Sequence, residues 1–139
     1  MIKIGIAGYG NLGKGAELAV RQNPDMKLTA IFTRRSPGSI KPQDPTIPVK
    51  HISEAQDMKN DIDVLLLCGG SATDLPEQGP AFAGMFNTVD SFDTHARIPE
   101  YFNAVDSAAR TGGKISVISA GWDPGLFSLS RMICQAMLP

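Results

Sequence analysis

Three glycines lie close together near the start of the chain, in the stretch Gly8-Tyr9-Gly10-Asn11-Leu12-Gly13. An apolar run of strand length, residues 1–7, precedes them, and a helical pattern follows. In this order Gly8 lets the chain turn, Gly10 leaves room for a phosphate at the backbone, and Gly13 lets the helix pack on the strand. The start of the helix offers free N–H groups and partial positive charge to that phosphate. We therefore predict a dinucleotide-binding turn; a glycine-rich turn without a ligand is the less favoured alternative.

The end of the next predicted strand indicates which nucleotide binds. Residues 28–33 form an apolar run of strand length, and Thr33-Arg34-Arg35 stands at its end. An NAD-binding unit carries an acidic residue about 20 positions after the turn, where it holds the ribose 2′-hydroxyl, and this stretch has none. Two guanidinium groups and a hydroxyl suit a 2′-phosphate, because arginine binds phosphate through paired, charge-assisted hydrogen bonds. We predict NADP in preference to NAD; a solvated basic loop is the alternative.

Alternating strands and helices must position these residues. We expect further strands at residues 62–68, 87–92 and 115–119, and a short extended piece at 49–52. Helices are expected after the glycine turn, after Ser53 as a cap, within residues 74–86, from Pro99 to Gly112-Gly113, and at the end of the chain. The expected apolar faces are Leu12, Ala16, Ala19 and Val20; Phe102, Val105, Ala108 and Ala109; and Leu126, Leu129, Ile133, Ala136 and Met137. This alternation predicts an α/β fold, a Rossmann-type doubly wound parallel sheet with helices on both faces.

Ligands of such sheets bind beyond the carboxyl ends of the strands. The stretches that should meet there are Gly8–Gly13, Thr33–Arg35, Cys68-Gly69-Gly70-Ser71-Ala72-Thr73, Ser91-Phe92-Asp93 and Ala120-Gly121-Trp122-Asp123-Pro124. Their convergence brings Asp93 and Asp123 to the edge that holds the cofactor. A carboxylate there can hold the ammonium group of an amine and take its proton before hydride leaves the adjacent carbon. The alternatives are a strand-end aspartate that accepts backbone hydrogen bonds and a helix cap just before Pro124.

Composition and charge exclude several classes of protein. A length of 139 residues, 42% hydrophobic and 19% charged, fits one globular domain with a core. A net charge of −1 gives no reason to expect nucleic acid or an anionic membrane as partner. No apolar run approaches the roughly 18 residues of a membrane span, and residues 1–7 are expected to form a strand rather than a signal peptide. Cys68 and Cys134 have neither a disulfide-framework nor a metal-site spacing, so we expect no metal. Taken together, these features make a cytoplasmic protein the default expectation.

Several motifs resemble those of the meso-diaminopimelate D-dehydrogenase family over nearly the whole chain. They are Gly-Tyr-Gly-Asn-Leu-Gly at 8–13, Phe-Thr-Arg-Arg at 32–35, Leu-Cys-Gly-Gly-Ser-Ala-Thr-Asp at 67–74, Pro-Glu-Gln at 76–78, Thr-Val-Asp-Ser-Phe-Asp at 88–93 and Ser-Ala-Gly-Trp-Asp-Pro-Gly at 119–125. The resemblance implies NADP-dependent oxidative deamination at the D-centre of meso-2,6-diaminopimelate, giving L-2-amino-6-oxopimelate, ammonia and NADPH in a route to lysine. It also implies that Asp93 and Asp123 meet the amino group of the D-centre.

Enzymes of this family are longer than this chain. The resemblance therefore implies that residues 1–139 form most of an NADP-binding domain, and that a second domain for substrate and dimer contacts is absent from this chain. It further implies a homodimer when the enzyme is full length, and an isolated fragment without turnover.

Two other functions stay open at this stage. The first is an NADP-dependent sugar dehydrogenase of the glucose-fructose oxidoreductase type. Such enzymes usually carry Glu-Lys-Pro after the fourth strand, whereas Ser91-Phe92-Asp93 stands at that point here. The second is a non-catalytic NADPH-binding module, which would keep Thr33–Arg35 but would not need the two carboxylates.

Overall fold

A single parallel sheet organises the molecule, for which a computed structural model describes residues 1–138, apart from the side chains of Asp123 and Pro124. Within these residues the strands are β1 (Ile2–Ala7), β2 (Met26–Thr33), β3 (Val49–His51), β4 (Val64–Leu67), β5 (Asn87–Asp90) and β6 (Ser116–Val117). All neighbours pair in parallel, in the order β3-β2-β1-β4-β5-β6. The strand order therefore changes direction between β1 and β4, which is where such sheets bind ligands. The predicted Rossmann-type sheet is confirmed.

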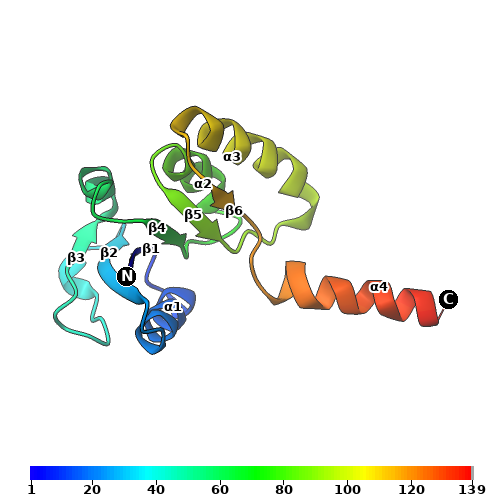
Figure 1. Cartoon of the computed structure of the whole chain (residues 1–139), viewed down its shortest axis with the longest axis horizontal. Coiled ribbons are helices and arrows are strands. Elements are labelled where there is room, and N and C mark those ends of the chain that lie inside the picture. Colours follow the sequence, from blue (N-terminus) through cyan, green and yellow to red (C-terminus); the bar gives the residue numbers. More distant parts are fainter. Residues whose placement is uncertain (139) are drawn as a thin grey trace.

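Helices cover both faces of this sheet. They are α1 (Asn11–Gln22), α2 (Leu75–Ala83), α3 (Ile98–Gly112) and α4 (Phe127–Met137), with 3₁₀ turns η1 (Pro37–Ser39), η2 (Ile52–Met58) and η3 (His95–Arg97) and a π-helical turn η4 (Trp122–Leu126). Figure 1 shows α1 on one side of the sheet, α2 and α3 on the other, and α4 extending away from the rest.

Two apolar clusters bury the faces of the sheet. On the α1 side, Ile4 and Ile6 of β1 pack with Tyr9 and Val20. On the α2–α3 side, Phe32, Leu65 and Leu67 pack with the helix residues Leu75, Phe82, Tyr101, Val105 and Ala109. The central strands are buried from both sides, as parallel strands in crossover units must be. This packing holds the carboxyl ends of the strands at one edge.

The orientation of α1 differs from the predicted one. Its buried residues are Gly13, Glu17 and Val20, whereas Leu12 is 49% exposed. A Cβ atom at Gly13 would lie 2.2 Å from the carbonyl oxygen of Gly8, so this side of the helix rests directly on the turn. Residues four and seven positions later share that side, which turns Leu12 toward solvent.

The cap of the next helical turn also differs from the predicted one. The ring of His51, not Ser53, caps η2, and it accepts a hydrogen bond from the Ser53 N–H at 3.4 Å. The Glu54 carboxylate accepts one in return from the His51 N–H at 2.9 Å, and this lowers the pKa of Glu54. A capping box needs its acid three residues after the cap, and Glu54 has that spacing from His51 but not from Ser53.

The last two helices differ in how they use their apolar residues. Gly113 ends α3 as predicted, in a left-handed conformation with φ of 64°. Val105 and Ala109 of α3 are buried, but Phe102 is 53% exposed. The predicted helix α4 is present, but its apolar side chains, including Leu129 and Ile133, are exposed. Among the described residues, no helix has both the length and the apolar character that crossing a membrane requires.

Candidate cofactor-binding and catalytic site

A cleft of about 430 Å³ lies where β1, β2 and β4 end. Nine of the predicted cofactor residues line it, namely Gly8, Tyr9, Gly10, Thr33, Arg34, Arg35, Cys68, Gly69 and Gly70. Three residues that sequence reasoning did not select complete the lining: Ile52, Asp74 and Gln78. The cleft thus opens at the point where the strand order changes direction, and it joins the glycine turn to the arginine pair.

The glycine turn has the geometry that a pyrophosphate needs. Gly8 has a φ of 95°, and a Cβ atom there would lie 2.9 Å from the carbonyl carbon and oxygen of Cys68. A Cβ atom on Gly10 would meet nothing within 4 Å, so the space above this residue is open. Helix α1 begins at Asn11, immediately after that opening. Bare backbone followed by a helix N-terminus fits a phosphate group.

The buried carboxylate of Glu17 supports this turn from the protein interior. The hydroxyl of Tyr9 donates a hydrogen bond to the Glu17 carboxylate, and both side chains are buried. Glu17 also accepts from the backbone N–H groups of Gln43 and Asp44, at 3.1 and 2.9 Å. Burial, followed by the hydrogen bond and charge of Glu17, raises the pKa of Tyr9 to about 12. Sequence reasoning missed Glu17, although its position four residues after Gly13 puts it on the buried face.

The two predicted phosphate-binding arginines are anchored in different ways. Arg34 Nη2 lies 2.7 Å from Asp74 Oδ1, and the Arg34 side chain is 62% exposed. Arg35 Nη2 donates to the carbonyl oxygen of Tyr9 at 2.8 Å, and its backbone N–H donates to Thr33 Oγ1 at 3.1 Å. Each guanidinium carries five N–H donors, so these bonds leave donors for a phosphate. Arg35 therefore connects the basic end of β2 to the glycine turn.

Asp74 closes the other side of the cleft. Its Oδ2 accepts a hydrogen bond from the Gly70 N–H at 3.0 Å, while its Oδ1 pairs with Arg34. Asp74 is the last residue of the motif at 67–74, but its type alone did not indicate a place beside a predicted phosphate site. Cys68 forms part of the wall, and burial raises the pKa of its thiol to about 12, so it is a poor nucleophile at neutral pH.

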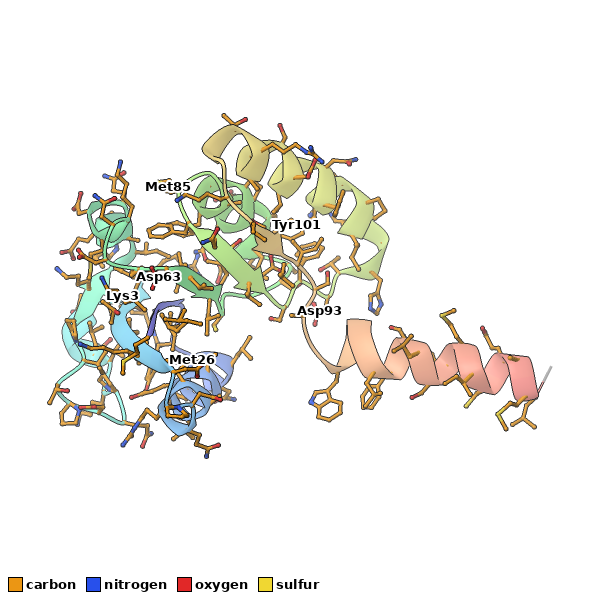
Figure 2. All side chains as sticks on the ribbon, viewed as in Figure 1. Lys3, Met26, Asp63, Met85, Asp93 and Tyr101 are labelled. Atoms are coloured by element: carbon orange, nitrogen blue, oxygen red, sulfur yellow. The ribbon has the colours of Figure 1, made fainter. Side chains whose placement is uncertain are left out.

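The predicted catalytic segment after β5 lies beside the cleft rather than in its lining. Ser71, the residue after Gly70, accepts hydrogen bonds on its Oγ from the N–H groups of Asp93 and Thr94, at 2.9 and 3.2 Å. Ser71 thus holds the backbone of Asp93 next to the rim, and the Asp93 side chain is exposed. Figure 2 shows Asp93 close to the point where, in this view, the chain leaves the sheet toward α4.

The remaining predicted residues do not line the cleft. Phe92 is buried, Ser91 is half-buried, and the others are exposed, namely Asn11, Leu12, Ala72, Ala120, Gly121 and Trp122. Trp122 is 67% exposed and packs near the ring of Phe127, with 5.8 Å between ring centroids. The side chains of Asp123 and Pro124 lie outside the described part of the structure. Among the described residues, no three His, Cys, Asp or Glu side chains are grouped to hold a metal ion.

Comparisons with known proteins were made by sequence and by structure. No family model matches the chain. The meso-diaminopimelate D-dehydrogenase of Ureibacillus thermosphaericus is 61% identical over 138 residues, which covers 99% of this chain and 42% of that protein. The enzyme of the same name from Corynebacterium glutamicum is 42% identical, covering 99% of this chain and 41% of that protein. The chain therefore spans about two fifths of the length of these curated relatives.

Solved structures agree with the sequence relatives. The Corynebacterium glutamicum diaminopimelate dehydrogenase in complex with diaminopimelate matches with a TM-score of 0.85 at 42% identity, over 99% of this chain and 41% of that one. An engineered D-amino acid dehydrogenase bound to NADP⁺ matches with a TM-score of 0.86, also at 42% identity, over 99% and 41%. A homoserine dehydrogenase of Staphylococcus aureus, 12% identical with a TM-score of 0.69, shares the fold.

The fold is that of a Rossmann-type unit of the kind found in dehydrogenases, and its cleft lies where such sheets bind ligands. More particularly, the chain is related over nearly its whole length to the N-terminal part of the meso-diaminopimelate D-dehydrogenases, and the resemblance seen in its motifs is confirmed.

Proposed function

We propose that this chain is the NADP-binding part of an amino-acid dehydrogenase that deaminates the D-centre of meso-2,6-diaminopimelate. The observation that carries the proposal is the 61% identity, over 99% of the chain, to a meso-diaminopimelate D-dehydrogenase. The products are L-2-amino-6-oxopimelate, ammonia and NADPH, in a route to lysine. A second domain, outside residues 1–139, supplies the rest of the substrate site, and the full-length enzyme is a homodimer in the cytoplasm.

The residues of the cleft fit NADP. The bare backbone at Gly10 and the start of α1 suit the pyrophosphate, and the guanidiniums of Arg34 and Arg35, with Thr33, suit the 2′-phosphate. The engineered relative that binds NADP⁺ supports the choice of this cofactor. When bound, NADP⁺ supplies the hydride acceptor of the reaction. The work of this part of the chain is to bind and orient that cofactor beside the substrate amine.

Asp93 and Asp123 carry the proposed chemistry at the amine. Their negative charges hold the substrate ammonium, and one of them takes a proton from it as hydride leaves the D-carbon. Water then adds to the resulting C=N bond and ammonia departs, which leaves the ketone of the product. The exposed position of Asp93 beside the cleft supports this role. For Asp123 the proposal rests on the family resemblance.

The function is tested by assaying the full-length enzyme with NADP and meso-, L,L- or D,D-diaminopimelate. We expect NADPH formation with the meso and D,D isomers, which have a D-centre, and none with the L,L isomer. Asp93→Asn and Asp123→Asn should each lower kcat/KM by about 10²-fold, because the amide is uncharged and a poor base. NADP affinity and thermal stability should change little. Turnover of the L,L isomer, or wild-type kcat/KM in both variants, would disprove the assignment.

The isolated chain separates binding from catalysis. We expect residues 1–139 to bind NADP weakly, because the proposed NADP contacts lie within them, but not to oxidise diaminopimelate. A non-catalytic NADPH-binding module would instead show no substrate-dependent NADPH signal even at full length. Isothermal titration with NADP and NAD, followed by the same assay, distinguishes the two functions.

A further inference from the structure

A second buried carboxylate, Asp90, lies at the end of β5 and has no role in the function proposed above. Its Oδ1 accepts hydrogen bonds from the backbone N–H groups of Phe92, at 2.9 Å, and Ser119, at 3.0 Å. Its Oδ2 accepts one from the Tyr101 hydroxyl at 2.6 Å. Its own carbonyl oxygen accepts from the Ala120 N–H at 2.8 Å. One residue therefore bonds to both segments that precede the predicted catalytic carboxylates.

The hydrogen bond from Ser119 to Asp90 continues the connection between β5 and β6 beyond the point where their backbone pairing ends. Strand β6 pairs with β5 at Ser116 and Val117 and no further, and beyond Val117 the chain continues toward η4. Ser119 adopts a left-handed conformation with φ of 58°, which is strained for a residue other than glycine. Its N–H and that of Ala120 both bond to Asp90. These two bonds hold the strained bend, which lies three to four residues before Asp123.

The bond to Phe92 fixes the other segment. Phe92 is buried, and its ring stacks on Tyr101 of α3 with 4.0 Å between centroids and 12° between planes. The Tyr101 hydroxyl also donates a hydrogen bond to Asp90, so the ring of Tyr101 contacts Phe92 while its hydroxyl contacts Asp90, two residues earlier. The backbone N–H of the next residue, Asp93, donates a hydrogen bond to Ser71 Oγ. Asp93 is thus fixed from both sides while its own side chain remains exposed.

We infer that Asp90 is a positioning residue, which sets the backbone of the two segments that carry Asp93 and Asp123. This inference rests on the proposed function, because it assigns those two aspartates to catalysis. Asp90 is buried, and its carboxylate oxygens accept hydrogen bonds from Phe92, Ser119 and Tyr101, so in this inference it acts through the segments that it holds. Small displacements of reacting groups cost large factors in rate, so loss of this anchor should lower turnover far more than NADP binding.

The test compares Asp90→Ala with its conservative counterpart Asp90→Asn. In this chain, Asp90→Ala should speed amide hydrogen exchange at Phe92, Ser119 and Ala120 at least tenfold relative to β1 amides. In the full-length enzyme it should lower kcat by about 10²-fold per folded molecule, with the Kd for NADP unchanged within twofold. Asp90→Asn should recover kcat to within about tenfold of wild type, since its oxygen can still accept both N–H groups. Asp106, a half-buried carboxylate on α3 that pairs with Arg110, provides the matched control, and Asp106→Asn should leave all three quantities unchanged.

The outcomes separate this inference from the proposed function. Wild-type kcat in Asp90→Ala, or an equal loss of kcat and NADP affinity, would overturn the positioning role. If Asp90→Ala does not fold, Tyr101→Phe decides: a loss of about tenfold in kcat with normal NADP affinity supports the role, and unchanged kcat overturns it. If the wild-type enzyme does not oxidise diaminopimelate, the proposed function fails. The amide exchange of this chain then decides by itself whether Asp90 holds the two segments.

Discussion

Glu17 and Asp90 are two buried carboxylates that accept hydrogen bonds from the same kinds of donor. Each accepts hydrogen bonds from one tyrosine hydroxyl, Tyr9 or Tyr101, and from two backbone N–H groups. Burying a carboxylate is costly unless several donors satisfy it, and here three donors do so in each case. The two groups nevertheless serve different ends of the site. Glu17 lies beneath the glycine turn, and Asp90 lies beneath the predicted catalytic segments.

The two networks are chemically alike, but they hold different segments of the chain. Glu17 ties the loop at Gln43-Asp44 to α1 and, through Tyr9, reaches the carbonyl that anchors Arg35. Asp90 ties the chain after β5 to the chain after β6. We therefore expect the proposed cofactor affinity and turnover to depend on separate anchors. Damage to one network should leave the other function largely intact, and this separation can be tested directly.

Removing the first anchor should have the largest effect. Glu17→Ala leaves the buried Tyr9 hydroxyl and two part-buried backbone N–H groups without their acceptor. This should cost about 3–5 kcal/mol of unfolding free energy in urea denaturation, with roughly 1–3 kcal/mol from the buried hydroxyl and less from each of the more exposed N–H groups than from a fully buried one. NADP affinity of the folded protein should also fall, because Tyr9 no longer has a fixed place. Glu17→Gln, which keeps one acceptor oxygen, should be milder on both counts. The exposed Glu100→Ala is the control. Unchanged NADP affinity in a folded Glu17 variant would show that the turn does not depend on this network.

The arginine pair offers a more selective way to damage the cofactor end. Replacing both (Arg34→Ala with Arg35→Ala) should weaken NADP binding by about 3 kcal/mol, since each charge-assisted bond contributes roughly 1.5–3 kcal/mol. NAD binding should barely change, and amide exchange at Phe92 and Ser119 should stay as in wild type. Asp74→Asn tests the ion pair separately and should change NADP affinity by less than the double variant does. Equal losses for NADP and NAD would remove the 2′-phosphate assignment.

The smallest expected effect is a loss of stability at high pH that involves both networks. Burial, then Glu17, raises the pKa of Tyr9 to about 12; burial, then Asp90, raises the pKa of Tyr101 above its ordinary range. In the unfolded chain both phenols lose their protons near pH 10, whereas the folded protein keeps them. Their contribution to stability is therefore complete below pH 10 and declines as the pH rises toward 12 and beyond.

Urea unfolding at pH 9, 10 and 11 measures this decline. We expect a loss of about 1 kcal/mol per tyrosine by pH 11, because one pKa unit corresponds to about 1.4 kcal/mol. Tyr9→Phe and Tyr101→Phe should each remove one tyrosine's contribution to the decrease of unfolding free energy with pH. Lysine titration affects the wild type and the variants alike, so the difference between them isolates the phenols. A slope that is identical in wild type and both variants would show that neither hydroxyl is linked to folding.

Local sequence was enough to predict most of the residues that line the cleft at the ends of β1, β2 and β4. The first three residues of the glycine turn, Thr33–Arg35 and the residues that follow β4 line the cleft where they were expected. The reason is that each depends on a short-range property: a backbone that only glycine permits, an apolar run of strand length, or a charged group at a strand end. The parallel sheet followed from the alternation of strands and helices, and the NADP⁺-bound relative agrees with the predicted cofactor. Catalytic roles for Asp93 and Asp123 stay predictions.

The two carboxylate networks were decided only by the tertiary structure. Glu17 meets Gln43 and Asp44 across 26 and 27 positions, and Asp90 meets Ser119 across 29. The spacing of Glu17 from Gly13 places it on the buried face of α1, but no periodicity in the sequence indicates which distant N–H groups an acid will meet. That choice is made when α1 rotates Gly13 onto the turn and when the bend after β6 comes to lie over the end of β5. Residue types and local spacing predicted which residues meet at the proposed phosphate site, whereas long-range packing decided which acids are withdrawn from solvent to hold the surrounding segments in place.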